Sequence, residues 1–296
     1  MGKELAAVFP ESREVFDTAD EVLGFPLSRL CFEGSESELA LTETTQPAIL
    51  TTSIAALRAL AARGVDAECA AGHSLGEYSA HVAAGTLEFH DAVRSVRERG
   101  RFMQHAVPVG EGAMAAILGL DLERIEDLCR EASGDGIVSP ANLNAPGQVV
   151  VAGHARAVDR AVELARGAGA KRALPLQVSA PFHCALMAPA AERLGPVLAD
   201  VAFHDPRFPV YANVDAVPIS DGDRARRALI EQVTSPVRWQ ACVEAMVLDG
   251  IDTMVEIGPG RVLSGLVKRI RGDVATMSVS DPEGVERVAR SIGGRS

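Results

Sequence analysis

The sequence of 296 residues predicts an α/β fold in which a smaller unit is inserted into a larger one. Helical spacing of apolar residues alternates with short apolar strands along most of the chain, which is typical of layered α/β domains. Between residues 109 and 179 the expected elements follow the order β-α-β-β-α-β, the ferredoxin-like split arrangement. We therefore expect residues 1–108 and 180–296 to form a large α/β subdomain and residues 109–179 a small ferredoxin-like one.

The elements of the large subdomain are predicted from apolar spacing and from residues that begin or end helices. Helices are expected at Ser12 to Leu23, Ala48 to Arg63, Asp91 to Ala106 and Arg224 to Val233, around Val243 and after Gly260. Strands are expected directly before Ser74, at Val210 to Val214 and at Thr253 to Ile257. The second helix should begin just after Pro47 and end at Gly64, because proline favours a first helical turn and glycine a helix end.

The small subdomain is predicted from four apolar strands and two amphipathic helices. The strands are expected at Ala113 to Leu118, Ile137 to Leu143, Val149 to Ala152 and Arg172 to Val178, and the helices at Leu122 to Ala132 and Ala155 to Arg166. The two middle strands are joined across Asn144-Ala145-Pro146-Gly147, whose residue types favour a turn.

Composition limits the classes of protein to which this chain can belong. The five cysteines are scattered and form no C-x-x-C pair, which argues against a disulfide framework and against a zinc site. No apolar run approaches the roughly 20 residues that span a bilayer, and the first residues lack a signal-peptide pattern. The net charge of −11 disfavours nucleic acid as a partner. This net charge does not exclude a local basic patch on the surface. We expect a cytoplasmic protein without a membrane segment, metal ion or cofactor. A monomer is compatible with the sequence, which does not determine the oligomeric state.

The most informative motif is Gly72-His73-Ser74-Leu75-Gly76, which follows a small-residue strand and precedes a helical pattern. A serine on a tight strand-to-helix turn projects its hydroxyl when the residues two before and two after it are nearly free of side chain, as in the nucleophile elbow of α/β hydrolases. Ser74 is thus the predicted nucleophile, and the large subdomain is expected to be α/β-hydrolase-like. The Leu75 amide should lie at the helix N-terminus, where it can stabilise an oxyanion. A plain glycine-serine turn is the alternative.

A serine nucleophile needs a base, and His183 is the best of the seven histidines. It follows the last strand of the inserted unit, where the chain returns to the subdomain that contains Ser74, and such junction loops often line sites. A histidine that merely caps a loop is the alternative interpretation.

Arg99 interrupts an apolar helical stripe formed by Ala92, Val96 and Met103. A guanidinium in that position needs an anionic partner, because burying it alone costs several kcal/mol. If no protein carboxylate pairs with Arg99, a substrate carboxylate would, since the planar guanidinium binds carboxylates with two hydrogen bonds. An ordinary ion pair, or a side chain that extends to the surface, is the alternative.

Four segments in this order resemble the malonyl-CoA:acyl carrier protein transacylases of type II fatty acid synthesis. They are Gly72-His73-Ser74-Leu75-Gly76-Glu77-Tyr78-Ser79, Arg99-Gly100-Arg101-Phe102-Met103-Gln104, Ala180-Pro181-Phe182-His183 and Glu256-Ile257-Gly258-Pro259-Gly260. The resemblance implies a Ser74–His183 dyad that takes malonyl from malonyl-CoA as a serine ester and passes it to the phosphopantetheine thiol of acyl carrier protein. It also implies that Arg99 binds the malonyl carboxylate and that the backbone carbonyl of Gln232 orients His183.

Further residues are expected at the substrate and at the partner surface. Leu75, Met103 and Phe182 are placed with the substrate-binding residues, and the bulk of Phe182 favours malonyl over α-branched groups unless it is a plain core aromatic. Because carrier proteins are acidic, docking should need a basic face. The candidates are Arg261, Lys268, Arg269 and Arg271, or Lys171 and Arg172, although such clusters are often solvated surface. Asn142 and Asn144 are candidates for contacts with coenzyme A.

Two rival functions remain open on the sequence alone. The first is a serine esterase or thioesterase that uses the same turn. Arg99 distinguishes the two functions, because only the transferase is expected to need a cation for a substrate carboxylate. The second is an inactive, partner-binding remnant, which follows from the start of the chain.

The resembled family begins with a strand and a G-Q-G-x-Q loop that supplies a second oxyanion donor, whereas this chain opens at Met1-Gly2-Lys3-Glu4-Leu5, in what looks like the following helix. Loss of one oxyanion donor costs about 100- to 1,000-fold in turnover. We therefore expect slow transfer or low stability unless that segment is restored, and full-speed transfer by this chain would contradict the expectation.

Overall fold

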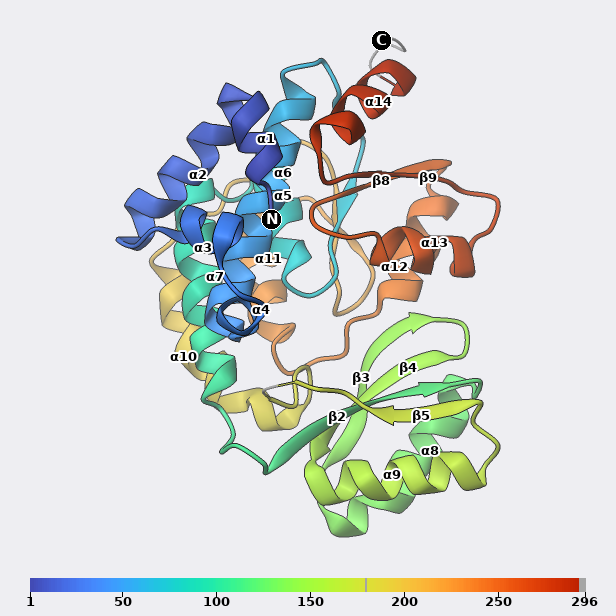
Figure 1. Ribbon diagram of the computed structural model, residues 1–296. Coiled ribbons are helices and arrows are strands. Elements are labelled where there is room, and N and C mark those ends of the chain that lie inside the picture. The colour runs from blue at the N-terminus through green and yellow to red at the C-terminus, as the bar shows by residue number, and fades with distance from the viewer. Residues whose placement is uncertain (179, 293–296) are drawn as a thin grey trace.

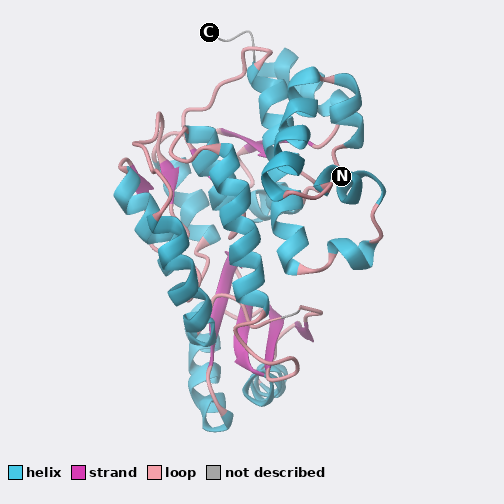
Figure 2. Ribbon diagram, turned by 90° about the vertical axis from the view of Figure 1, so that its left-hand side faces the viewer, coloured by secondary structure: helices cyan, strands magenta, loops and turns pink. Residues whose placement is uncertain are grey.

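The computed structural model describes residues 1–178 and 180–292 and shows an α/β fold, as the sequence predicts (Figure 1). Ser179, the last residue of the predicted insertion, lies outside the described residues. In Figures 1 and 2 the four-stranded sheet lies at the end of the molecule opposite α14, and most of the helices lie above it. No helix among the described residues is long and apolar enough to cross a membrane.

A layer of helices forms the largest apolar core. Its members are α1 (Lys3–Val8), α2 (Pro10–Leu23), α3 (Leu27–Glu33), α4 (Glu36–Leu39), α5 (Thr42–Ala61), α6 (Gly76–Ala84), α7 (Phe89–Gln104) and α10 (Ala188–Ala199). Helix α5 is buried along most of its length and brings Leu50 and Ile54 into the core, where they pack with Val96 of α7. The predicted helices at Ser12 to Leu23 and Asp91 to Ala106 are confirmed to within a few residues.

The prediction that a helix begins after Pro47 is wrong, because α5 begins at Thr42 and contains Pro47. A proline inside a helix loses one amide hydrogen bond and strains the preceding turn, so that turn needs support from elsewhere. Helix α7 provides it, because Gly100 brings the two backbones together: a Cβ on Gly100 would lie 2.6 Å from the Thr42 carbonyl oxygen. The first turn of α5 is therefore held by tertiary packing that a local pattern does not reveal.

Outside residues 109–178, the strands form two short sheets. In the first, β1 (Ala70–Ala71) pairs in parallel with β6 (Val210–Tyr211), which pairs antiparallel with β7 (Pro218–Ile219). In the second, β8 (Thr253–Ile257) pairs in parallel with β9 (Ala275–Val279). The helices around them are α11 (Gly222–Glu231), α12 (Trp239–Leu248), α13 (Val262–Ile270) and α14 (Pro282–Ile292). The strand predicted to reach Val214 ends at Tyr211, while the one predicted at Thr253 to Ile257 is confirmed.

The inserted segment forms one four-stranded antiparallel sheet covered by two helices. Its elements are β2 (Gly112–Leu118), α8 (Leu122–Ala132), β3 (Val138–Ala145), β4 (Gln148–His154), α9 (Ala155–Gly167) and β5 (Arg172–Pro175), and the strand order is β3-β4-β2-β5. A separate apolar core, which includes Ile117, Leu128 and Val158, lies between the sheet and these helices. Strand β5 ends at Pro175, short of the predicted Val178, although the Leu176 amide still donates to the Met114 carbonyl at 2.8 Å.

The edge strand β3 fastens the inserted sheet to the rest of the protein. The Leu143 amide donates to the Val237 carbonyl and the Val237 amide donates to the Ala141 carbonyl, each at 2.8 Å. Val237 lies just before α12 and is fully buried. This backbone pairing places the end of β3 beside the turn that contains Ser74, where Asn144 meets His73.

Candidate active site

Ser74 occupies a sharp turn between β1 and α6, as predicted. Its φ of 53° lies in the left-handed region, which is unusual for a residue with a side chain. Gly72 makes the turn possible, because a Cβ there would lie 1.9 Å from the carbonyl of Gly76. The expectation that Gly76 must also lack a side chain is wrong, since a Cβ at Gly76 meets no atom within 4 Å.

His183 meets Ser74 as the sequence predicts. The Ser74 hydroxyl lies 2.7 Å from His183 Nε2, and His183 Nδ1 lies 2.9 Å from the Gln232 carbonyl oxygen. An imidazole that donates from Nδ1 to this carbonyl leaves Nε2 free to accept the serine proton. Burial and the charge of Arg99 lower the pKa of His183 to about 3. His183 is therefore a neutral imidazole at physiological pH, ready to accept a proton from Ser74.

Arg99 lies beside this pair with 2% of its surface exposed. One terminal nitrogen donates to Gln46 Oε1 at 2.7 Å, and the other donates to Gln232 Oε1 at 2.8 Å and to the Ser74 hydroxyl at 3.1 Å. Arg99 Nε is buried without a partner, and no carboxylate of the described residues lies within 4.0 Å of the guanidinium. Of the interpretations open on sequence, the ordinary ion pair and the surface-directed side chain do not fit. The side chain is a buried cation with unused donor capacity beside the Ser74 hydroxyl.

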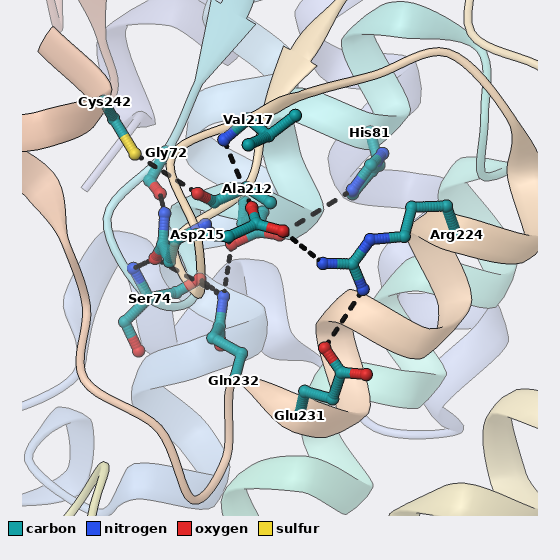
Figure 3. A network of polar contacts seen from close by, with 12 residues as sticks. Gly72, Ser74, His81, Ala212, Asp215, Val217, Arg224, Glu231, Gln232 and Cys242 are labelled. Carbon is teal, nitrogen blue, oxygen red and sulfur yellow. Dashed lines mark hydrogen bonds and ion pairs between the residues drawn. The ribbon is translucent and has the colours of Figure 1, made fainter. Parts of the chain in front are cut away.

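Ser74 also belongs to a polar network that sequence reasoning missed (Figure 3). Glu77 Oε2 accepts from the Asn213 backbone amide at 2.9 Å and from Gln232 Nε2 at 2.8 Å. Burial raises the pKa of Glu77 to about 7, against the opposing effect of these two hydrogen bonds. Gln232 Nε2 also donates to the Ser74 carbonyl at 3.0 Å. The Gln232 side chain therefore joins the acid of this network to Arg99.

The other predicted substrate-binding residues lie close by without direct polar contacts to Ser74. The Leu75 amide has no hydrogen-bond acceptor within the described residues, so it is free to donate to an oxyanion. Met103 is buried, and its sulfur lies 4.0 Å from Gln46 Nε2. Phe182 is partly buried and packs against two apolar clusters, the core of the helical layer and a smaller cluster at the four-stranded sheet.

The two basic segments predicted from sequence meet at one cleft. Lys171, Arg172 and Arg269 line an opening of about 620 Å³. Arg269 donates to Gln148 at 2.7 Å, whereas neither Lys171 nor Arg172 has a carboxylate within 4.0 Å among the described residues. Arg271 is instead paired with Asp273. Of the two asparagines, Asn144 Oδ1 lies 2.8 Å from His73 Nε2, and Asn142 Oδ1 is buried without a partner.

Comparisons with known proteins agree on one family over nearly the whole chain. Residues 1–281 match the acyl transferase domain. The malonyl CoA-acyl carrier protein transacylase of Bacillus subtilis (strain 168) is 50% identical over 293 residues, which cover 99% of this chain and 92% of that protein. The transacylase of the same name from Escherichia coli (strain K12) is 49% identical over 280 residues, covering 94% of this chain and 91% of that protein.

Solved structures give the same result. The malonyl CoA-acyl carrier protein transacylase from Coxiella burnetii superposes with a TM-score of 0.97 at 41% identity, covering 99% of this chain and 93% of the other. A malonyl-transacylase solved in complex with its type II PKS acyl-carrier protein superposes with a TM-score of 0.96 at 47% identity, covering 98% and 94%.

The low pKa of His183 predicts that acylation of Ser74 is nearly independent of pH from 8 down to about 5, because the base stays neutral over that range. The measurement is the single-turnover rate of Ser74 acylation by an acyl thioester, taken at each pH at which circular dichroism shows the protein to be folded. A rate that falls by about tenfold per pH unit below 6.5, the ordinary pKa of histidine, would contradict this description of the base.

Proposed function

The chain belongs to the acyl transferase domain family, and from that premise we propose that it moves a malonyl group from coenzyme A to the phosphopantetheine thiol of acyl carrier protein. The observation that carries this proposal is the position of Arg99, a buried cation without a carboxylate partner, 3.1 Å from the nucleophilic hydroxyl. A malonyl group bears a free carboxylate close to its thioester carbonyl. The site is therefore complementary to a diacid thioester and not to a simple acyl one.

In the first half-reaction, Ser74 Oγ attacks the thioester carbonyl while His183 Nε2 takes its proton. The Leu75 amide donates to the oxyanion that forms. When the carbon–sulfur bond breaks, the proton on His183 passes to the departing coenzyme A thiol, and the malonyl group remains as an ester on Ser74. The Gln232 carbonyl stabilises the protonated imidazole, in the place that an acidic residue has in other serine enzymes.

The second half-reaction reverses these roles with a different thiol. The phosphopantetheine thiol gives its proton to His183 and attacks the malonyl ester, and the Ser74 oxygen then recovers a proton as the ester bond breaks. Water competes for the same ester. Arg99, by holding the carboxylate, fixes the malonyl group and occupies space that an attacking water would need.

The remaining residues of the site are assigned roles within this proposal. Met103 supports Gln46, which in turn holds Arg99, and Phe182 limits the room beside His183 and favours malonyl over α-branched groups. We assign residues 1–108 and 180–296 to an α/β-hydrolase-like subdomain and residues 109–179 to a ferredoxin-like one; the β-α-β-β-α-β order and the strand order of the inserted sheet support this division. Five cysteines without disulfide bonds support a cytoplasmic location.

Transfer to Ser74 is tested by incubating the protein with malonyl-CoA and measuring its intact mass. We expect a malonyl adduct that is absent in Ser74→Ala and that disappears when carrier protein is added, because the second thiol accepts the group. Free malonate released without an adduct and without transfer would favour a serine hydrolase. Absence of any adduct on a folded protein would favour an inactive remnant.

We assign carrier-protein docking to the cleft lined by Lys171, Arg172 and Arg269, because an acidic partner needs an unpaired basic surface on a protein of net charge −11. We expect Lys171→Glu with Arg269→Glu to slow transfer to carrier protein by about tenfold and to leave transfer to free pantetheine unchanged. Arg227→Glu, on the exposed face of α11, is the matched control. Equal losses with both thiols would place these residues in the active site, and no loss with either would remove them from the docking surface.

A further inference from the structure

We propose that Asn213 is a positioning residue that holds the nucleophilic turn in its reactive shape. This inference rests on the proposed function, since the turn in question presents Ser74 to the acyl donor. Asn213 lies just after β6 and is fully buried. Its Oδ1 accepts from the Ser74 amide at 2.7 Å, and its Nδ2 donates to the Gly72 carbonyl at 2.8 Å.

These two hydrogen bonds continue a strand ladder by means of a side chain. Strands β1 and β6 pair at Ala70 with Val210 and at Ala71 with Tyr211, and the regular pairing ends there. One residue pair further along, the chain must turn sharply into α6, and a backbone ladder cannot follow it. The side-chain amide of Asn213 has a donor and an acceptor, as a peptide group does. It therefore forms the next pair of hydrogen bonds of the ladder, and forms them with the turn.

The turn needs this support because its conformation is unfavourable on its own. Ser74 has a φ of 53°, and backbone strain of this kind persists only where surrounding structure enforces it. Asn213 holds the turn on both sides of His73, at Gly72 and at Ser74. The same turn directs Ser74 Oγ toward His183 and leaves the Leu75 amide free. Loss of the Asn213 side-chain amide would therefore displace both the Ser74 hydroxyl and the Leu75 backbone amide.

Asn213 is itself held in place by its own backbone. Its backbone amide donates to Glu77 Oε2 at 2.9 Å, and its backbone carbonyl accepts from the Arg238 backbone amide at 2.9 Å. Gln232 Nε2 lies 3.4 Å from Asn213 Oδ1, which favours the amide orientation with the oxygen toward Ser74. Gly72, Ser74 and Gln232, which the Asn213 side chain contacts, are labelled in the network of Figure 3. The neighbours of Asn213 thus fix both its position and the orientation of its amide.

The requirement for one donor and one acceptor determines which variants test the proposal. Asn213→Asp keeps the shape and the acceptor but places a second oxygen against the Gly72 carbonyl, and Asn213→Ala removes both contacts. Cys242→Ala is the matched control, because Cys242 is equally buried and its thiol lies 3.3 Å from the carbonyl of the adjacent Ala212, yet it does not touch the turn. Unfolding temperatures of all variants separate kinetic from stability effects.

Two rates are measured on each variant, namely the formation of the malonyl adduct by rapid quench and mass spectrometry, and labelling by a fluorophosphonate. We expect both Asn213 variants to lose about 100-fold in the maximal rate of adduct formation, with a similar loss in phosphonate labelling, as misplacement of a reacting group by about 1 Å does. The malonyl-CoA concentration at half-maximal rate should stay within about twofold, because Arg99 is untouched. Cys242→Ala should react at the wild-type rate.

The proposal is overturned if a folded Asn213 variant reacts at the wild-type rate, if Cys242→Ala loses as much, or if neither Asn213 variant folds while Cys242→Ala does. Failure of the proposed function has a different signature. In that case the wild-type protein is labelled by the phosphonate but takes no malonyl group, and the phosphonate rates still decide the role of Asn213.

Discussion

The buried charge of Arg99 is the constraint around which the site is organised. Moving a guanidinium out of water costs several kcal/mol unless its donors are satisfied and its charge is compensated. Here the terminal nitrogens donate to two glutamine oxygens and to the Ser74 hydroxyl, not to a carboxylate. Glu77, whose pKa burial raises to about 7, accepts from the far side of the Gln232 amide and compensates the charge in its ionised form. Because the compensation acts at a distance, no carboxylate of the described residues pairs with the guanidinium, as the proposed binding of a substrate carboxylate requires.

Gln232 shows how one residue couples the parts of this arrangement. Its side-chain amide donates to Glu77 and accepts from Arg99, so these two hydrogen bonds together determine the orientation of that amide. Its backbone carbonyl meets His183. The orientation of His183 and the position of Arg99 therefore depend on the same short segment after α11. Gln232 also donates to the Ser74 carbonyl at 3.0 Å, so the turn that contains Ser74 is linked to this segment as well as to β6.

The parts of the site that follow from local sequence are those whose chemistry is local. Ser74 was predictable because a strand, two glycines and a helix stand next to it in the chain, and Arg99 because it breaks an apolar stripe. His183 needed the resemblance as well as its position. Gln46 and Asn213 were not predictable, since each acts on residues more than 50 positions away and neither interrupts a recognisable pattern. The same limit explains the early start of α5, where contact with Gly100 outweighs the local effect of Pro47.

The central claim is that Arg99 selects the substrate by its carboxylate, and competition between malonyl-CoA and acetyl-CoA for Ser74 tests it most directly. The ratio of the two adducts is measured by intact mass for the wild-type protein and for Arg99→Ala. Removing a hydrogen-bonded charge pair should reduce the preference for malonyl by about 100-fold. An unchanged ratio in a folded Arg99→Ala protein would contradict the claim and would leave Arg99 with a structural role alone.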